Sequence, residues 1–321
     1  MLKGKKTLIT GLLLLIGCLA AQAQFDGQWT QYMFNPGLYN PGAVGLNSDL
    51  NVHLTFREQW TDVKNAPSTF GLHVGSPLLI GNRVSGIGLL MLNESIGLFR
   101  TQWLQLQFAY KKKLWGGALS LGLQGGLLQE NFDASGIYIP NSDYHTTADA
   151  SIPTGSIEGM IPDFSFGAWY NRAQWYAGLS CSHLLGGNIN LKQKEGDAET
   201  EGTRFNVTRT LYLTGGYNIQ LRNPLLSLQP SLLVMSDLVA VQTDLSAILR
   251  YADKYWGGLD FRPGSALGVL VGTTFDFGLS IGYSYDITMV STSGSHEVFI
   301  GYRKKIDTNR FNKKQKSIRI L

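Results

Sequence analysis

Hydrophobic and polar residues alternate along most of this chain, in many short segments. In the segment 277–287, Leu279, Ile281 and Tyr283 fall on one face, while small polar residues and glycines fall on the other. Alternation of this kind has the two-residue period of a β-strand, whose neighbouring side chains point to opposite faces. Almost no segment shows the 3.6-residue period of a helix, so the pattern predicts an all-β protein.

Fourteen segments carry the alternating pattern and are predicted to be strands. They are 51–60, 69–78, 83–92, 102–113, 116–130, 161–172, 173–185, 209–220, 226–237, 239–252, 255–262, 266–275, 277–287 and 296–304. A soluble sandwich would turn the apolar faces inward onto a second sheet. An outer-membrane barrel would turn them outward to lipid and line its lumen with the polar faces, and bacterial single-chain barrels have an even number of strands.

Aromatic residues gather near the predicted strand ends, where barrels carry girdles of rings at the membrane interface. The expected girdle residues are Trp60, Trp103, Tyr110, Trp115, Trp169, Tyr170, Trp175, Tyr176, Tyr255, Trp256 and Tyr302. Glycine supplies 38 of the 321 residues, and many of these glycines lie inside predicted strands, where they relieve crowding in a curved sheet. Both features favour an antiparallel transmembrane β-barrel over a large soluble periplasmic β-protein. On this interpretation Leu279, Ile281 and Tyr283 face lipid.

The lengths of the connections predict the orientation. Both ends of an even-stranded barrel lie on one side, and outer-membrane barrels place their longer loops outside the cell. The longest connections, 131–160 and 186–208, follow odd-numbered strands and are therefore expected to be extracellular. The shorter ones expected on the same side are 61–68, 93–101 and 288–295. Long and short connections largely alternate along the chain. A tight connection around Asp237, where an outside loop is expected, breaks this alternation, so the strand count stays open at that point.

The chain begins with the features of a secretory signal peptide. Residues 1–23 combine a basic start, an apolar run and a final Ala-Gln-Ala, so cleavage is expected after Ala23. A competing interpretation is a lipoprotein processing site that ends in Cys18. Once the signal is removed, Cys181 remains as the single cysteine of the mature chain, which excludes an intramolecular disulfide.

Charge is distributed unevenly, although the formal net charge is only +4 and the pI is about 8.9. From Arg303 to the end there are eight Lys or Arg residues and one acid, Asp307, and the rest of the chain is slightly acidic. The basic pI therefore describes a tail and not a nucleic-acid-binding surface. Residues 306–321 are predicted to be a basic tail on the periplasmic side, and no nucleic-acid partner is expected.

No arrangement of reactive side chains predicts catalysis, a cofactor or a metal. The histidines are His53, His73, His145, His183 and His296. No two of them have the spacing of metal ligands, and no glycine-rich phosphate loop joins a strand to a helix. The nearest approach to a hydrolase is Ser295 and His296 with Asp286 across a hairpin, and these residues also fit an ordinary polar loop edge. We therefore expect a protein that is not an enzyme.

The stretch 31–45, QYMFNPGLYNPGAVG, contains two Asn-Pro pairs and no strand pattern. A residue before proline is driven into extended or turn geometry, and asparagine can bond its own backbone, so positions 35–36 and 40–41 are expected to fix two bends. Several apolar side chains surround these bends. We therefore expect residues 24–50 to dock as a plug or lid at the periplasmic mouth or in the lumen of the barrel; the alternative is a linker.

This stretch resembles the N-terminal signature of the PorP/SprF family of outer-membrane proteins of Bacteroidota. The matching residues are Gln31, Tyr32, Met33, Phe34, Asn35, Pro36, Asn40, Pro41 and Gly45, followed by a second block with Arg57, Gln59, Trp60 and Pro67. Two further similar blocks lie at 250–272 and 278–305. The chain departs from the family where Gly42-Ala43-Val44 replaces Ala-Tyr-Ala, which removes one aromatic side chain, and where it continues past the family's final Gly-Tyr-Arg.

The resemblance implies an outer-membrane barrel over residues 51–305 that acts as an accessory component of type IX secretion. Such a protein would support the export or surface attachment of secreted cargo such as adhesins. The implied partners are outer-membrane lipids, other type IX components, in some members a peptidoglycan-binding periplasmic lipoprotein, and the C-terminal domain of the cargo. Two other functions stay open: an outer-membrane channel for hydrophobic or small solutes, and the barrel hydrolase mentioned above.

Overall fold

The computed structural model describes six parts of the chain. They are residues 26–46, 49–81, 83–136, 155–193, 204–289 and 293–306. The predicted signal peptide, nearly all of the basic tail and the middle of the two longest loops lie outside the described residues. Within the described parts, no helix is long and apolar enough to cross a membrane.

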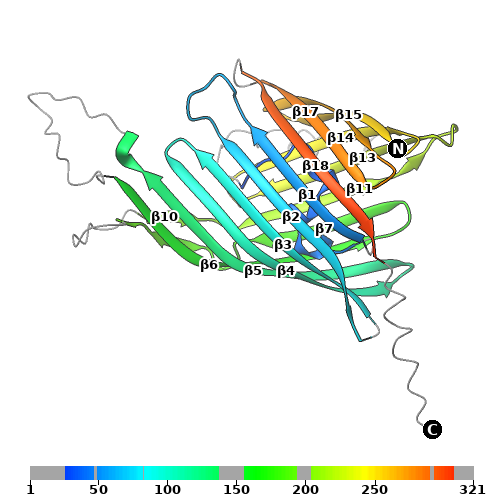
Figure 1. Cartoon of the computed structure of the whole chain (residues 1–321), viewed down its shortest axis with the longest axis horizontal. Coiled ribbons are helices and arrows are strands. Elements are labelled where there is room, and N and C mark those ends of the chain that lie inside the picture. The colour runs from blue at the N-terminus through cyan, green and yellow to red at the C-terminus, as the bar shows by residue number, and fades with distance from the viewer. Residues whose placement is uncertain are drawn as a thin grey trace, which may run out of the picture.

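Fourteen antiparallel strands form one closed β-barrel (Figure 1). They are β1 (Asp49–Glu58), β2 (Ser68–Ile80), β3 (Arg83–Ile96), β4 (Phe99–Leu114), β5 (Gly117–Asp133), β6 (Ser156–Asn171), β7 (Trp175–Ser182), β11 (Thr210–Tyr217), β13 (Leu226–Ser236), β14 (Val241–Tyr251), β15 (Tyr255–Arg262), β16 (Ala266–Thr274), β17 (Leu279–Thr288) and β18 (Ser295–Lys305). Each pairs with the strand before and after it, and β1 pairs with β18 to close the ring. The predicted fold class and all fourteen predicted strands are confirmed.

Of four further short strands, two extend the barrel wall and two form a separate sheet. β9 (Lys192–Gln193) pairs with β6, and β12 (Ile219–Gln220) pairs with β13. β8 (Gly187–Asn190) and β10 (Arg204–Val207) pair with each other as a separate hairpin. The sequence pattern predicted one continuous loop over 186–208, so this hairpin was missed; its strands are too short to show a clear period.

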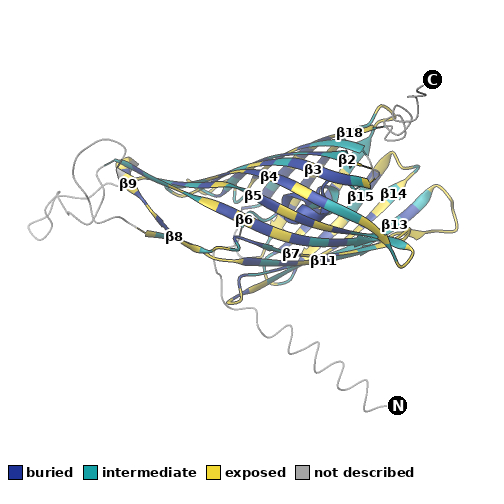
Figure 2. Ribbon diagram, turned by 90° about the horizontal axis from the view of Figure 1, so that it is seen from below, coloured by how far each residue is buried: buried dark blue, intermediate teal, exposed yellow. Residues whose placement is uncertain are grey.

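The barrel has two unlike ends. Asp49 at the start of β1 pairs with Lys305 at the end of β18, so both ends of the barrel chain lie at one rim, here called the terminal end. The opposite rim is called the far end. The wall is tall at β5, which has 17 residues, and low at β7, which has 8 (Figures 1 and 2). Which end faces the cell exterior stays a prediction.

Two connections at the far end bear on the loop lengths expected from the sequence. The predicted loop 93–101 is wrong, because β3 and β4 continue through it and only Gly97 and Leu98 join them. The tight connection after β13 is a true turn between two separate strands, since Ser236 pairs with Val241. It is stabilised by Asp237, whose Oδ1 accepts bonds from the backbone N–H groups of Val239 and Ala240 at 3.0 and 2.7 Å.

The outer face of the barrel is apolar and the inner face is polar, as predicted. In β17, Ile281 and Tyr283 are exposed, whereas Ser284 and Asp286 are buried, and Figure 2 shows the same alternation along the other strands. Leu279, at the start of the strand, is half-buried. Apolar residues on the outside can contact only lipid hydrocarbon without a penalty, so this arrangement fits a barrel that spans a membrane.

Four residues of the predicted aromatic girdle instead point into the lumen. Trp103, Trp169 and Trp256 are each less than 10% exposed, and Tyr176 stacks on Trp169 with the ring centroids 4.9 Å apart, so the prediction is wrong for these four. They occupy inward positions of the strand alternation, where their rings pack within the barrel. Trp115, in the turn after β4, and Tyr255, the first residue of β15, are exposed at the terminal end, and these two do occupy the position expected of interfacial rings.

Candidate functional site: the lumen and the segment that fills it

Residues 26–46 lie inside the barrel and are called the plug. The plug contains three single turns of 3₁₀ helix: η1 (Tyr32–Phe34), η2 (Pro36–Leu38) and η3 (Pro41–Ala43). A proline occupies the first position of η2 and of η3, where its missing N–H costs nothing and its fixed φ suits the turn. The sequence had left the mouth and the lumen as alternative docking places; the plug contacts the inner walls of strands on all sides of the lumen.

The two asparagines of the Asn-Pro pairs behave differently. Asn40 bonds its own backbone as expected: its Oδ1 accepts from the N–H of Gly42 at 2.9 Å. Its Nδ2 also donates to the carbonyl oxygens of Ala168 in β6 and Leu179 in β7, at 3.1 and 3.3 Å. Asn35 is equally buried, but its side chain has no hydrogen-bond partner among the described residues, so the expected bond to its own backbone is absent.

Glycines on the inner wall make room for the plug. A Cβ at Gly122 of β5 would overlap the backbone carbonyl of Pro41, and one at Gly167 of β6 would overlap the side chain of Asn40. A Cβ at Gly86 of β3 would likewise overlap the backbone carbonyl of Val44. From the sequence alone, glycines inside strands are expected to relieve crowding in a curved sheet. In these positions they are needed because only a residue without a side chain lets the plug backbone approach the wall.

Replacing Gly122 by alanine is expected to loosen the plug while leaving the barrel assembled. The added methyl group would displace the backbone at Pro41, at a cost of about 1–3 kcal/mol for overpacking. Limited proteolysis of the purified protein should then cleave within residues 26–46. The matched control is Gly257→Ala, where the nearest atom to the new Cβ is 3.5 Å away. Equal protease resistance of both variants would contradict this account of the glycine.

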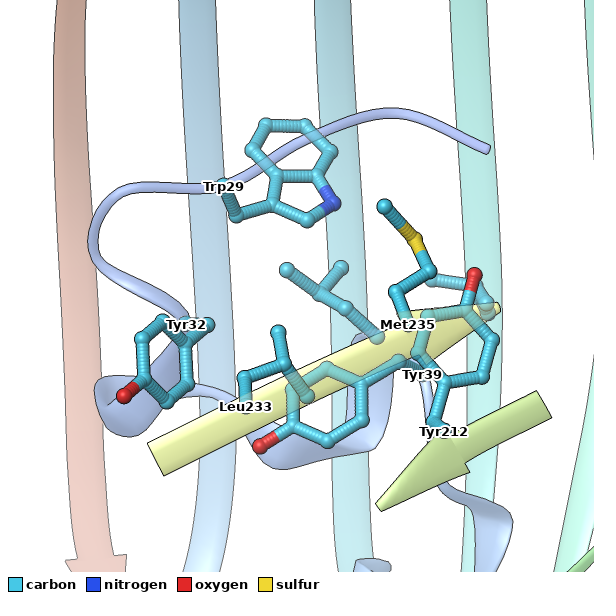
Figure 3. Close-up of a cluster of buried hydrophobic side chains, with 8 residues drawn as sticks. Trp29, Tyr32, Tyr39, Tyr212, Leu233 and Met235 are labelled. Carbon is cyan, nitrogen blue, oxygen red and sulfur yellow. The ribbon is translucent and has the colours of Figure 1, made fainter. Parts of the chain in front are cut away.

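Apolar and aromatic side chains hold the middle of the plug. Trp29, Tyr32 and Tyr39 of the plug pack against strands β11 and β13 (Figure 3). The strand residues of this cluster that Figure 3 labels are Tyr212, Leu233 and Met235. The hydroxyl of Tyr32 also reaches the hydroxyl of Ser231 at 3.0 Å. Each such side chain contributes about 1.5–3 kcal/mol when it is fully buried, so the plug is a packed part of the fold.

A buried arginine ties the start of the plug to three barrel strands. Arg57 of β1 forms ion pairs with Asp286 of β17 at 2.7 Å and with Glu297 of β18 at 3.1 Å. Its Nη1 also donates to the hydroxyl oxygen of Thr30 at 2.8 Å. Glu297 in turn accepts the backbone N–H groups of Thr30 at 2.8 Å and of Gln31 at 3.0 Å. One cation therefore neutralises two inward carboxylates and fixes the plug between them.

The charge network continues along the inner wall. Arg262 of β15 pairs with Asp244 of β14 and lies 3.7 Å from the shared Asp286. Ser246 donates to Asp260, whose carboxylate is also buried. The family motif contains Arg57, but no motif in the sequence singles out these acids as its partners. The available signal was that Asp244, Asp260, Asp286 and Glu297 all fall on the polar face of predicted strands.

A second group of charges fixes the first residue of the plug. His183, which follows β7, lies between two carboxylates: its Nε2 is 3.1 Å from Asp26 and its Nδ1 is 3.0 Å from Asp163 of β6. The hydroxyl of Tyr212 also donates to Asp26. The sequence had offered no role for His183, because its partners are distant in the chain.

The other residues of the second motif block shape the connection after β1. The backbone N–H of Gln59 donates to the carbonyl of Pro67 at 2.9 Å, and the N–H of Trp60 donates to the hydroxyl of Ser295 at 3.3 Å. These contacts close the loop at the far end and bring β1 and β2 together. Their role here is structural, since their backbone bonds complete a turn.

The hydrolase candidate is not assembled. His296 lies on the opposite face of β18 from Ser295 and bonds the hydroxyl of Tyr283 at 2.8 Å. Asp286 is paired with Arg57 and Thr30, and no side-chain hydrogen bond joins the three candidate residues to each other. Asp286 does lie across the hairpin from this pair, where it is in register with Ser295, but the alternation of a strand places the neighbouring His296 on the other side.

A closed antiparallel barrel with an apolar outer face and a polar lumen, filled by its own N-terminal segment, is an outer-membrane β-barrel protein. The chain belongs to the PorP/SprF family: the family described as "Type IX secretion system membrane protein PorP/SprF" matches residues 21–302. The resemblance predicted from the sequence is thereby confirmed, and the family is one of outer-membrane secretion components.

Comparison with other known proteins adds likeness of shape only. No curated protein matches the chain. Among solved structures it is similar to Acinetobacter baumannii Omp33 (8% identity, 81% of this chain and 100% of that chain, TM-score 0.45). It is also similar to the Ralstonia pickettii toluene transporter TbuX (11%, 89% and 96%, 0.45) and to the CymD monoaromatic hydrocarbon channel (11%, 90% and 96%, 0.46).

Proposed function

We propose that this protein is an accessory outer-membrane barrel of the type IX secretion system that supports the export or surface attachment of secreted cargo such as adhesins. The observation that carries the proposal is the family match over residues 21–302, which spans the plug and nearly the whole barrel. Its partners would be other components of that system, with a peptidoglycan-binding periplasmic lipoprotein and the C-terminal domain of the cargo as candidates.

The packing of the lumen supports a scaffold more than a channel. The plug contacts β3, β5, β6, β13 and β18 through hydrogen bonds or close backbone packing, and it is anchored at its start by buried ion pairs. A segment held in so many places is expected to obstruct the passage of solutes. The binding surfaces offered to partners are then the two rims of the barrel, and we expect no catalytic turnover.

The proposal is tested by deleting the gene in its host and restoring it with the wild-type chain. We expect the deletion to remove a defined set of proteins from the cell surface, with wild-type levels of other outer-membrane barrels in the same cells. Quantitative proteomics of the cell surface and the medium measures this effect, and complementation is the control. An unchanged set of secreted proteins, together with impaired uptake of a hydrophobic or small solute, would favour the channel instead.

A further inference from the structure

A cavity of about 360 Å³ opens at the terminal end of the barrel, on the terminal side of the plug. Plug residues, among them Met33 to Gly37, form part of its lining, and the rest comes from strands β1, β2, β6, β7, β11, β13, β14 and β18 and the turns beside them. Pockets for small ligands are typically about 300–1,000 Å³, so this one suits a small ligand or the last few residues of a chain, not a folded domain.

The charges that line the cavity are mostly positive. They are Arg172, Arg250 and Arg303, against the single acid Asp49. Within the described part of the chain, none of the three arginines has an ion-pair partner within 4.0 Å or a side-chain hydrogen bond. Arg250 is half-buried, and its Nε is shielded from solvent without a partner. This contrasts with Arg57 and Arg262, which are both paired with carboxylates deeper in the lumen.

Two buried polar groups of the cavity lining are also unpartnered. Both the Nδ2 and the Oδ1 of Asn35 lack a hydrogen bond among the described residues, although the residue is only 1% exposed. Nδ1 of His73 also lacks a hydrogen bond among the described residues, while its Nε2 bonds Gln107 at 2.9 Å. Buried polar atoms without partners cost about 1–3 kcal/mol each, so they mark a place where a ligand can supply the missing bonds.

We propose that this cavity binds the carboxylate end of an extended peptide that approaches from the terminal end of the barrel. A guanidinium can hold a carboxylate through two parallel hydrogen bonds, which suits Arg250 and Arg303 to the terminal carboxylate. The side-chain amide of Asn35 offers one donor and one acceptor, which matches the C=O and N–H of a peptide group. The aromatic residues Trp169, Tyr176 and Phe34 supply an apolar lining for a side chain.

A fatty acid shares the carboxylate but fits the cavity less well. Its alkyl chain has no donor or acceptor, so the amide of Asn35 would remain buried and unsatisfied after binding. A peptide satisfies the arginines and Asn35 together. The inference goes beyond the proposed secretion role and does not depend on it, since it concerns binding that can be measured on the purified protein.

The test uses the purified full chain, immobilised in detergent, and a library of randomised hexapeptides made once with free C-terminal carboxylates and once with C-terminal amides. Mass spectrometry of the bound fraction should show an enrichment of about tenfold for the free carboxylates, the effect of losing a charge-assisted hydrogen bond. Arg250→Gln combined with Arg303→Gln should abolish that preference. The matched control is Arg222→Gln, an exposed arginine in a turn of the same end that does not line the cavity.

Asn35→Leu separates the two sources of carboxylate. This variant should lose most of the peptide binding, and dodecanoate should compete poorly with peptides on the wild-type protein. Folding of each variant is checked by the heat-dependent mobility shift of the barrel. The proposal is overturned by equal binding of amidated peptides, by full binding in the double arginine variant, by capture of dodecanoate in preference to peptides, or by no enrichment at all.

Discussion

Replacing Arg57 by methionine is expected to destabilise the protein by about 3–5 kcal/mol, because it leaves the buried carboxylate of Glu297 without its cation and Asp286 with only the more distant Arg262. The loss should appear as a lower temperature at which the folded barrel band disappears in a heat-dependent mobility assay. The plug should also become sensitive to protease near Thr30, since Thr30 bonds both carboxylates and the arginine.

The control for this change is Arg100→Met, which removes the same charge from an exposed position of β4. Surface charges contribute little to stability, so this variant should keep the wild-type transition within about 1 kcal/mol. An Arg57→Met barrel that melts like wild type, with its plug still resistant to protease, would show that the two carboxylates are satisfied in some other way.

Ile281→Arg is the second change with a large expected effect. Ile281 is 39% exposed on the outer face of β17, where the barrel contacts lipid. An arginine on the lipid face costs about 2–4 kcal/mol near the middle of the membrane. The amount of folded barrel recovered from outer membranes should therefore fall, as measured by the fraction that shows the heat-dependent mobility shift.

The neighbouring Ser280 provides the control, because it lies on the lumen side of the same strand and its hydroxyl bonds that of Thr274 at 3.0 Å. Ser280→Arg should be tolerated better than Ile281→Arg. Gly282 is unsuitable for this purpose, since a Cβ there would overlap the ring of Phe299 and approach the side chain of Gln31. A greater loss for Ser280→Arg would show that the two faces of the strand have been assigned the wrong way round.

The alternation of residues was sufficient to predict the strands and their faces. The period of two is a local property of an extended chain. Because one face of each strand contacts lipid, every second residue of the strand must be apolar. The plug was predicted on similarly local grounds, because proline restricts its own φ and the residue before it. For the same reason the bond that Asn40 Oδ1 accepts from the N–H of Gly42, two residues away, agreed with expectation.

The contacts that hold the plug could not be predicted in this way, because they join residues far apart in the chain. Arg57 meets carboxylates 229 and 240 positions away, and only closure of β1 against β18 brings them together. In the sequence, a glycine that makes room for the plug cannot be told from one that serves the curvature of the sheet. Only the folded barrel shows the difference, because it places the plug backbone against Gly122.

Alternation also could not tell an interfacial tryptophan from one that packs inside. Trp256 lies on the lumen face, with its ring 4.3 Å from that of Phe34, and the sequence pattern shows no sign of that partner. The unpartnered amide of Asn35 is another feature that the sequence pattern could not predict. Its local sequence predicts a bend and a bond to its own backbone, and only the folded barrel, by excluding solvent around it, leaves its two polar atoms free in a cavity lined by arginines.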